Sequence, residues 1–318
     1  MNLIALFVAL GLERAVTQLF HLREPRWFDS YIDWTLARFR ALSGAALILL
    51  TLLLVLLPVI PVWLIAHVFR DTLLGLPYVA FATLVLVFSF GPRDLQQEVD
   101  DYLEALEKGD RAAAASVARE IMEHDAAQRT GSSAQSLEEA IFAQANNRLF
   151  GVAFWFMVSG PAGAWLFRVS DLMRRRAVFE YRERAADPRA VPQFVGVLQA
   201  IHGVLAWAPA RLLAFGYALA GNFERALQAW RERASAPGGR FFDTNDHLLA
   251  AVGRAALNEA AEDLVPEAGA SAEPAQVVSV DFPLADAARV NASISLVRRS
   301  LLIWLVLVSA LVLVGWVR

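Results

Sequence analysis

The stretch Ala45–Phe69, AALILLTLLLVLLPVIPVWLIAHVF, runs for 25 residues without an Asp, Glu, Lys or Arg. A helix that crosses the hydrocarbon core of a bilayer needs about 20 predominantly apolar residues. Pro58 and Pro61 predict a kink, which neighbouring helices tolerate in a membrane. This segment therefore predicts a transmembrane helix, and it decides that the chain is an integral membrane protein.

Three further apolar segments predict membrane helices on either side of it. Residues 73–90 follow after a three-residue polar turn, so that 45–69 and 73–90 form a hairpin. Residues 1–12 lack a basic start and a small-residue cleavage site, which favours an uncleaved span over a removed signal peptide. Residues 299–318 predict a carboxyl-terminal transmembrane anchor. The membrane part at the amino end thus covers residues 1–90.

The composition agrees with a lipid environment and excludes several functions. Hydrophobic residues make up 57% of the 318 residues, against roughly 45–50% in soluble domains. The net charge of −3 argues against nucleic-acid binding. The absence of cysteine excludes disulfides, thiolate chemistry and iron–sulfur clusters. The only lysine, Lys108, precedes a glycine, whereas a phosphate-binding P-loop needs lysine after glycine.

Two apolar segments within residues 149–220 are interrupted. Residues 150–169 contain Ser159-Gly160-Pro161-Ala162-Gly163, a sequence that could divide the segment into two half-helices. Residues 191–220 contain four polar or helix-breaking residues, Gln199, His202, Pro209 and Arg211. Such interruptions at membrane depth are tolerated only where protein or water surrounds them. We predict broken helices over 149–220 that re-enter or lie at the interface, and full crossings remain the alternative.

The distribution of basic residues predicts an orientation, because short loops rich in Lys and Arg stay in the cytoplasm. Five arginines fall within residues 13–44 and six basic residues within 91–148, whereas Arg70 alone marks the hairpin tip. We therefore predict that the amino and carboxyl ends are periplasmic and that the main loops are cytoplasmic.

The segments outside the predicted membrane helices are also predicted to be helical. Residues 91–148 form a helical hairpin in which Leu95, Val99 and Tyr102 share an apolar face, Gly109 ends the first helix and Asp110 caps the second. We assign the acidic residues of its first helix to a solvated face, namely Glu98, Asp100, Asp101 and Glu104. Residues 221–298 form a second helical region with a flexible linker at about 265–276. No segment alternates with period two, so the predicted fold is all-α, with about four transmembrane helices, re-entrant or interfacial helices and helical cytoplasmic segments.

Ionisable side chains within apolar segments are candidate ligand-binding residues. Placing a charge in the bilayer costs about 2.5–3.5 kcal/mol, so its presence there calls for a reason. Arg211, Arg168 and Asp171 are such residues. In one interpretation Arg211 grips a phosphate or carboxylate, with Arg168 and Asp171 orienting it. In the other, Arg211 reaches lipid headgroups or forms a structural pair with Asp171. The five histidines never fall at the spacing of a helical zinc pair, and we predict no metal and no cofactor.

Several elements resemble those of a known family. They are an apolar start with Glu13-Arg14, a Gly-Pro-Arg-Asp-Leu at 91–95, an Ala-Leu-x-x-Gly-Asp turn, the run 150–171, a Trp-x-Pro-x-Arg-Leu at 207–212 and a final anchor. In this order the chain resembles the AmpE family, inner-membrane proteins associated with the regulation of inducible beta-lactamase and encoded beside an anhydromuropeptide amidase. The resemblance covers nearly the whole chain, and it implies a bacterial inner-membrane location.

That family is similar to the membrane-bound adenosylcobinamide-phosphate synthases (CobD/CbiB), which form an amide with ATP and magnesium. Phe154-Trp155 and Pro209-Ala210-Arg211-Leu212 fit the synthase pattern. The acidic positions do not fit: Ala143-Gln144 stand where the resemblance places Glu-Asn, Asn147 where it places Asp, and His202-Gly203 where it places Asp-Asp. Because a magnesium-dependent ligase needs carboxylates to hold its metal, the resemblance implies that this branch has lost the chemistry.

The sequence therefore favours a non-enzymatic signalling modulator linked to beta-lactamase induction and peptidoglycan recycling. We expect it to bind an anionic, muropeptide-like small molecule or a partner protein at the cytoplasmic membrane face. The predicted ligand-binding residues are Arg211, Asp171, Arg168, Trp155, His202 and Asn147. The alternatives are an ATP-dependent amide ligase and a non-catalytic helical scaffold that forms homo-oligomers through its spans.

Overall fold

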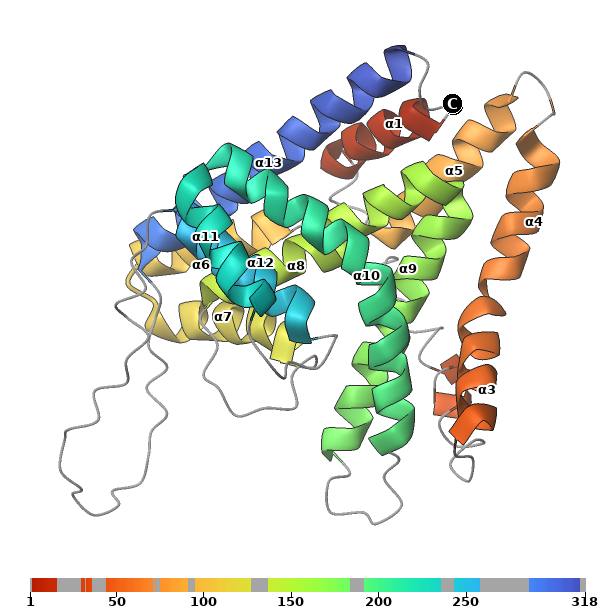
Figure 1. Cartoon of the computed structure of the whole chain (residues 1–318), viewed down its shortest axis with the longest axis horizontal. Coiled ribbons are helices and arrows are strands. Elements are labelled where there is room, and N and C mark those ends of the chain that lie inside the picture. Colours follow the sequence, from red (N-terminus) through yellow and green to blue (C-terminus); the bar gives the residue numbers. More distant parts are fainter. Residues whose placement is uncertain are drawn as a thin grey trace.

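A computed structural model shows a helical protein (Figure 1). It describes residues 2–15, 30–31, 33–35, 44–70, 72, 75–90, 95–126, 137–183, 192–235, 243–257 and 286–314. These ranges contain helices and turns and no β-strand, which confirms the all-α class. The helices are α1 (Asn2–Ala15), α3 (Gly44–Leu56), α4 (Val59–Arg70), α5 (Leu76–Ser89), α6 (Leu95–Glu107), α7 (Arg111–Ala126), α8 (Leu137–Gln144), the π-helix η3 (Ala145–Phe150), α9 (Gly151–Glu183), α10 (Pro192–Ala220), α11 (Phe223–Ser235), α12 (Asp243–Ala256) and α13 (Ala287–Leu313).

Up to four helical segments are long and apolar enough to cross a membrane. Three are continuous by this measure, Leu137–Phe179, Gln193–Ala220 and Ala287–Leu313. The fourth is α3 with α4, which bend by 41° at their junction. The bend coincides with Pro58, as predicted from the missing backbone donor of proline.

The structure has three to four helical segments long enough to span a membrane, in agreement with the predicted number of about four, but they are not the same four segments that we predicted. The two interrupted segments in 149–220, for which we favoured re-entry, are among those long enough to cross. The apolar helices near the amino end, Asn2–Gly11 and Leu76–Ser89, are shorter. Which of these helices traverse the bilayer remains a prediction.

Gly160 breaks α9 into two halves. Its φ of 68° and ψ of −156° lie in a region that is open almost only to glycine. Pro161 follows it and cannot donate the hydrogen bond that would continue the first half. Figure 1 shows α9 changing direction, so that its second half runs beside α10. The interruption at 159–163 therefore produces the two half-helices that the sequence suggested.

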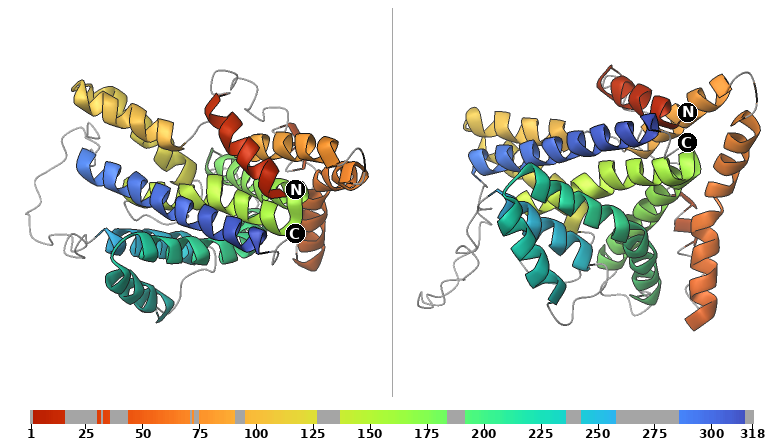
Figure 2. Two further views of the ribbon diagram at one scale, coloured as in Figure 1. Left: turned by 90° about the horizontal axis from the view of Figure 1, so that it is seen from above. Right: turned by 45° about the horizontal axis from the view of Figure 1, so that its top comes forward.

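The bend is held against the amino-terminal helices. A Cβ atom on Gly160 would lie 3.1 Å from the hydroxyl of Tyr78, which in turn donates a 2.6 Å hydrogen bond to Asn2. Side chains of α1, α5 and the first half of α9 share one apolar core. Figure 2 shows the start of α1 and the end of α13 close together in both views.

Two further apolar cores surround the second half of α9 and the helical hairpins. Residues of α3, the second half of α9 and the start of α10 form one of them. The larger one joins α6, α7, α8, α10, α12 and α13. The polar residues described below lie where these cores meet, on α9, α10 and η3.

The predicted hairpin turn at Gly109 and Asp110 is confirmed. Gly109, with a φ of 71°, separates α6 from α7, and the carboxylate of Asp110 accepts a 2.9 Å hydrogen bond from the backbone of Ala113. Asn222 caps α11 in the same way through the backbone of Arg225, at 3.1 Å. The predicted linker at 265–276 lies outside the described residues.

Candidate functional site

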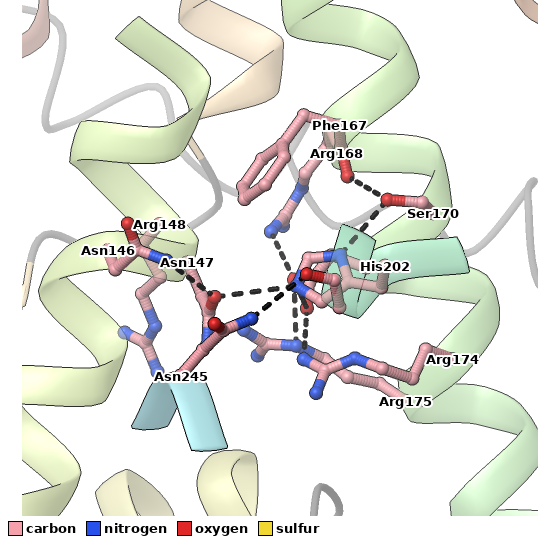
Figure 3. Close-up of polar contacts among 12 residues, drawn as sticks. Asn146, Asn147, Arg148, Phe167, Arg168, Ser170, Arg174, Arg175, His202 and Asn245 are labelled. Carbon is pink, nitrogen blue, oxygen red and sulfur yellow. Dashed lines mark hydrogen bonds and ion pairs between the residues drawn. The ribbon is translucent and has the colours of Figure 1, made fainter. Parts of the chain in front are cut away.

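A cluster of charged and amide side chains is buried between α9, η3 and α10 (Figure 3). Residues 168, 174 and 175 on α9 are each three or four residues from Asp171 and therefore lie beside it on the helix surface. Figure 3 shows Arg168, Arg174 and Arg175 pointing toward His202 and Asn147. We call the four guanidinium groups of Arg148, Arg168, Arg174 and Arg175 the arginine cluster.

Asp171 lies within the arginine cluster, and its side chain has no exposed surface. Its carboxylate accepts a 2.6 Å hydrogen bond from Arg174. Arg168 lies 3.4 Å from the same carboxylate, and Nε of Arg175 lies 2.8 Å from it. The contact with Arg175 is an ion pair without hydrogen-bond geometry, because Nε of Arg175 has no hydrogen-bond partner. The carboxylate of Asp171 therefore forms ion pairs with three guanidinium groups.

His202 joins α10 to this cluster. Its Nδ1 lies 3.0 Å from the hydroxyl of Ser170, and that hydroxyl donates to the carbonyl oxygen of Phe167 at 2.7 Å. Its Nε2 lies 3.4 Å from the side-chain oxygen of Asn147 and 3.9 Å from the carboxylate of Asp171. The imidazole thus connects η3, α9 and α10 at one point.

Arg148, on η3, extends the cluster toward the helical hairpin. It donates to Glu98 of α6 at 2.8 Å and to Gln144 of α8 at 3.0 Å. The same oxygen of Gln144 accepts a 3.3 Å hydrogen bond from Arg175. Because Glu98 is 3% exposed, our assignment of this residue to a solvated face was wrong. The other three acids of that group, Asp100, Asp101 and Glu104, are exposed as predicted.

The arginine cluster carries more positive than negative charge. In the ion pairs of the described residues, four guanidinium groups contact the carboxylates of Asp171 and Glu98, which leaves a surplus of two positive charges with His202 neutral. A buried lysine or histidine can lose its proton, but arginine does not deprotonate in proteins. Titration of the arginines therefore cannot remove the surplus.

Some buried donors of the cluster also lack a hydrogen-bond acceptor among the described residues. They are Nε of Arg174, Nε of Arg175 and Nε2 of Gln144. Unsatisfied buried donors cost about 1–3 kcal/mol each, and more when they are charged. Surplus charge and unpaired donors together favour an anion at this place.

Four of the six predicted site residues meet in this cluster, namely Asn147, Arg168, Asp171 and His202. Trp155 lies on the first half of α9, where its indole nitrogen donates to the carbonyl oxygen of Leu205 at 2.9 Å. That contact links α9 to α10 and is separate from the charged groups.

Arg211 has different partners from those we expected. It donates to the side chain of Asn245 at 3.0 Å and to the carbonyl oxygen of Trp207 at 3.1 Å, and it lies 4.2 Å above the Trp207 ring. Asn245 donates in turn to Gly203 at 2.9 Å, beside His202. Asn245 therefore orients Arg211, in place of Arg168 and Asp171. The reason is distance along α10, since nine residues separate 202 from 211 and correspond to about 13 Å of helix.

Arg174, Arg175, Arg148 and Glu98 were missed as site residues. The arginine triplet at 174–176 is visible in the sequence. Spacing from Asp171 could have revealed Arg174 and Arg175, because three and four residues bring side chains together on a helix. Among the described residues, no group of three or more His, Asp or Glu side chains could hold a metal ion.

The fold and the site define an all-helical, multi-pass membrane protein with a buried, arginine-rich charge cluster between its broken helices. The family model described as "Regulatory signalling modulator protein AmpE" matches residues 1–236. The chain belongs to the AmpE family.

Curated relatives are cobalamin biosynthesis proteins. The "Cobalamin biosynthesis protein CobD" of Stutzerimonas stutzeri (strain A1501) is 30% identical over 179 residues, which cover 56% of each chain. The protein of the same name from Chromobacterium violaceum is 27% identical over 155 residues, which cover 47% of this chain and 46% of the relative. The chain thus spans about half the length of the curated relatives that it matches. No solved structure matches it significantly.

Proposed function

We propose that this AmpE-family protein is a non-enzymatic signalling modulator of the bacterial inner membrane whose arginine cluster binds an anionic ligand. The observation that carries the proposal is the surplus of two positive charges around Asp171, which arginine cannot relieve by losing protons. The fraction of protein with ligand bound at the cluster would follow the ligand concentration. This would make the protein a sensor in the signalling that links peptidoglycan recycling to beta-lactamase induction.

The charge of the cluster also favours this proposal over an amide ligase. Asn147 and His202 stand where the resemblance places acids, Gln144 stands where it places an Asn, and all three lie in the cluster. Magnesium prefers carboxylate oxygens, and a site with surplus positive charge repels it. A cluster with these side chains suits an anion without a metal.

A purely structural scaffold is the other alternative. A scaffold would be served better by apolar packing between α9 and α10, because buried charges rarely contribute net stability. Three buried arginines and the partly buried Arg175 therefore favour a binding role. A partner protein could supply the anion as a carboxylate, and a small muropeptide-like molecule could supply it in free form.

Arg211 and Trp155 have a positioning role in this proposal. Arg211 holds α12 against α10 through Asn245, and Asn245 contacts the backbone beside His202. Trp155 ties the first half of α9 to α10. Both keep the helices that carry the cluster in register.

The proposed topology has the cluster at the cytoplasmic membrane face, with both chain ends in the periplasm. The proximity of the start of α1 and the end of α13 supports a common side for the two ends (Figure 2). The excess of basic residues in 13–44 and 91–148 supports a cytoplasmic location for these loops.

The test is isothermal titration of the detergent-solubilised protein with an anhydromuropeptide. We expect the wild type to bind, and Arg174→Gln to bind about tenfold to a hundredfold more weakly, since it loses charged hydrogen bonds. Arg211→Ala would weaken binding less, and the exposed Arg111→Gln would leave it unchanged. Equal binding by all four proteins would contradict the proposal, and so would a wild type that binds neither the anhydromuropeptide nor inorganic phosphate.

A further inference from the structure

We infer that the group bound by the arginine cluster is a phosphoryl group, a tetrahedral dianion, held between Arg174, Arg175 and Arg148. This inference rests on the proposed function, because it specifies which anion the cluster takes. Two features of the cluster distinguish a phosphoryl group from a carboxylate, namely the size of the charge surplus and the number of unpaired donors.

The charge surplus matches a dianion. Within the described ion pairs, four guanidinium groups share two carboxylates, so two positive charges are unbalanced. A carboxylate ligand carries one negative charge and would leave one guanidinium group uncompensated. A phosphate monoester carries about −1.5 to −2 at pH 7, which balances the cluster.

The donors match three oxygen atoms. Nε of Arg174 and Nε2 of Gln144 have no hydrogen-bond acceptor among the described residues, and Nε of Arg175 has only an ion pair with Asp171 that lacks hydrogen-bond geometry. A phosphoryl group offers three terminal oxygens to these three donors. A carboxylate has two oxygens. The guanidinium fork is also the side chain that binds phosphate with two parallel hydrogen bonds.

Gln144 places the third donor beside the guanidinium groups. Its side-chain oxygen accepts from Arg148 at 3.0 Å and from Arg175 at 3.3 Å, so its amide nitrogen lies next to both arginines. A glutamate at this position would instead pair with these arginines and supply part of the missing negative charge. The amide therefore keeps the surplus available for a ligand.

The most accessible member of the cluster is Arg175, whose side chain is 15% exposed, against 6% for Arg174 and for Arg168. Arg176, the next residue, is held away from the cluster by two contacts with Asp33, at 3.0 and 3.1 Å. A ligand would therefore reach the cluster beside Arg175, at the end of α9 where Arg176 lies.

The experiment compares methyl phosphate, inorganic phosphate and acetate by isothermal titration with the full chain in detergent. We expect methyl phosphate to bind at least tenfold more tightly than acetate, and Arg174→Gln to lose this difference while Arg111→Gln retains it. Equal affinity for methyl phosphate and acetate would overturn the phosphoryl inference and leave the proposed anion site standing. Binding of none of the probes, with or without lipid, would overturn both.

A lipid headgroup and a free molecule could both supply the phosphoryl group. The second arm of the experiment therefore places the protein in phosphatidylcholine nanodiscs with and without phosphatidic acid. Stabilisation by phosphatidic acid that Arg174→Gln removes would support the inference with lipid as the source. Binding of methyl phosphate in both kinds of nanodisc would support it with a soluble source.

Gln144→Glu keeps the inference testable if Arg174→Gln fails to fold. It adds a negative charge beside Arg148 and Arg175, so we expect a higher thermal midpoint without ligand and loss of methyl phosphate binding. Gln144→Ala is the control, since it removes the same donor without adding charge. Retained phosphate affinity in Gln144→Glu would contradict a phosphoryl site at this position.

Discussion

The carboxylate of Asp171 lies 2.6 Å from the guanidinium group of Arg174, and neither side chain is more than 6% exposed. Arg168 and Arg175 lie within 3.4 Å of the same carboxylate. Asp171 is thus the nearest negative charge for two buried guanidinium groups and for the partly buried Arg175. The stability of the second half of α9 depends on it, and so does the positive surplus that we assign to ligand binding.

Asp171→Asn should strongly destabilise the unliganded protein. Removing one partner of a buried ion pair costs about 3–5 kcal/mol, because the remaining charge is left uncompensated. Asp33→Asn is the control: it breaks the partly exposed pair with Arg176 and should cost no more than about 1 kcal/mol. Unfolding in mixed micelles measures both values, and similar losses would show that the arginines do not depend on Asp171.

Gly160→Ala should destabilise the protein by about 1–3 kcal/mol, since alanine is strained at a φ of 68° and a ψ of −156°. Gly196→Ala is the matched control within α10, where an added Cβ has no atom within 4 Å. That change should stabilise the helix by about 0.5–1 kcal/mol. Thermal unfolding distinguishes the two, and an equal effect of both substitutions would argue against a break at Gly160.

Asp110→Ala should destabilise the α6–α7 hairpin by about 0.5–2 kcal/mol, because it removes the cap on the backbone of Ala113. The exposed Asp101 provides the control, and Asp101→Ala should change stability by less than about 0.5 kcal/mol. Hydrogen exchange of the first turn of α7 gives the local readout. Unchanged protection of that turn in Asp110→Ala would contradict the capping role.

Lys108, the only lysine, offers a pH-dependent probe of the same hairpin. Its ammonium group is hydrogen-bonded to Glu104, which raises the pKa of Lys108 above its usual value. Fewer neutral amines are then present at a given pH, so Glu104→Gln should speed the reaction of Lys108 with an amine-reactive ester and shift its pH profile downward. Peptide mapping separates this product from the labelled amino terminus, and identical profiles would mean that the pair does not form in solution.

The same lysine tests the topology of the chain. If residues 91–148 are cytoplasmic, a membrane-impermeant ester should label Lys108 in inverted vesicles and leave it unlabelled in intact spheroplasts. A single cysteine introduced at the hairpin tip near Arg70 should give the opposite pattern with a thiol reagent, because the chain has no cysteine of its own. Labelling of Lys108 in spheroplasts would reverse the predicted orientation.

The fold class and the position of the break were predictable because they depend on local sequence. The charge-free run at 45–69 determines a membrane helix by length alone, and the Gly160-Pro161 pair interrupts a helix whatever surrounds it. The caps at Asp110 and Asn222 are local in the same sense.

The charge cluster was only partly predictable, because its contacts join distant residues. Asp171 and Arg168 stood out as ions in an apolar segment, but the partner of Arg148 is Glu98, 50 residues away on another helix. The partner of Arg211 is Asn245, 34 residues away. Such pairs depend on which helices pack against each other. Neither the periodicity of hydrophobic residues nor the spacing of charged residues specifies this packing.

The most direct test of anion binding at the arginine cluster is anomalous X-ray diffraction from crystals of the full chain grown with tungstate, a tetrahedral dianion like phosphate. We predict an anomalous peak from the tungsten atom at the arginine cluster. The tungstate oxygens should lie about 2.7–2.9 Å from the guanidinium nitrogens of Arg174 and Arg175, and Gln144→Glu crystals should have no such peak. Tungstate found only at surface sites, with the arginines closed around Asp171 and nothing bound between them, would contradict the proposed binding site.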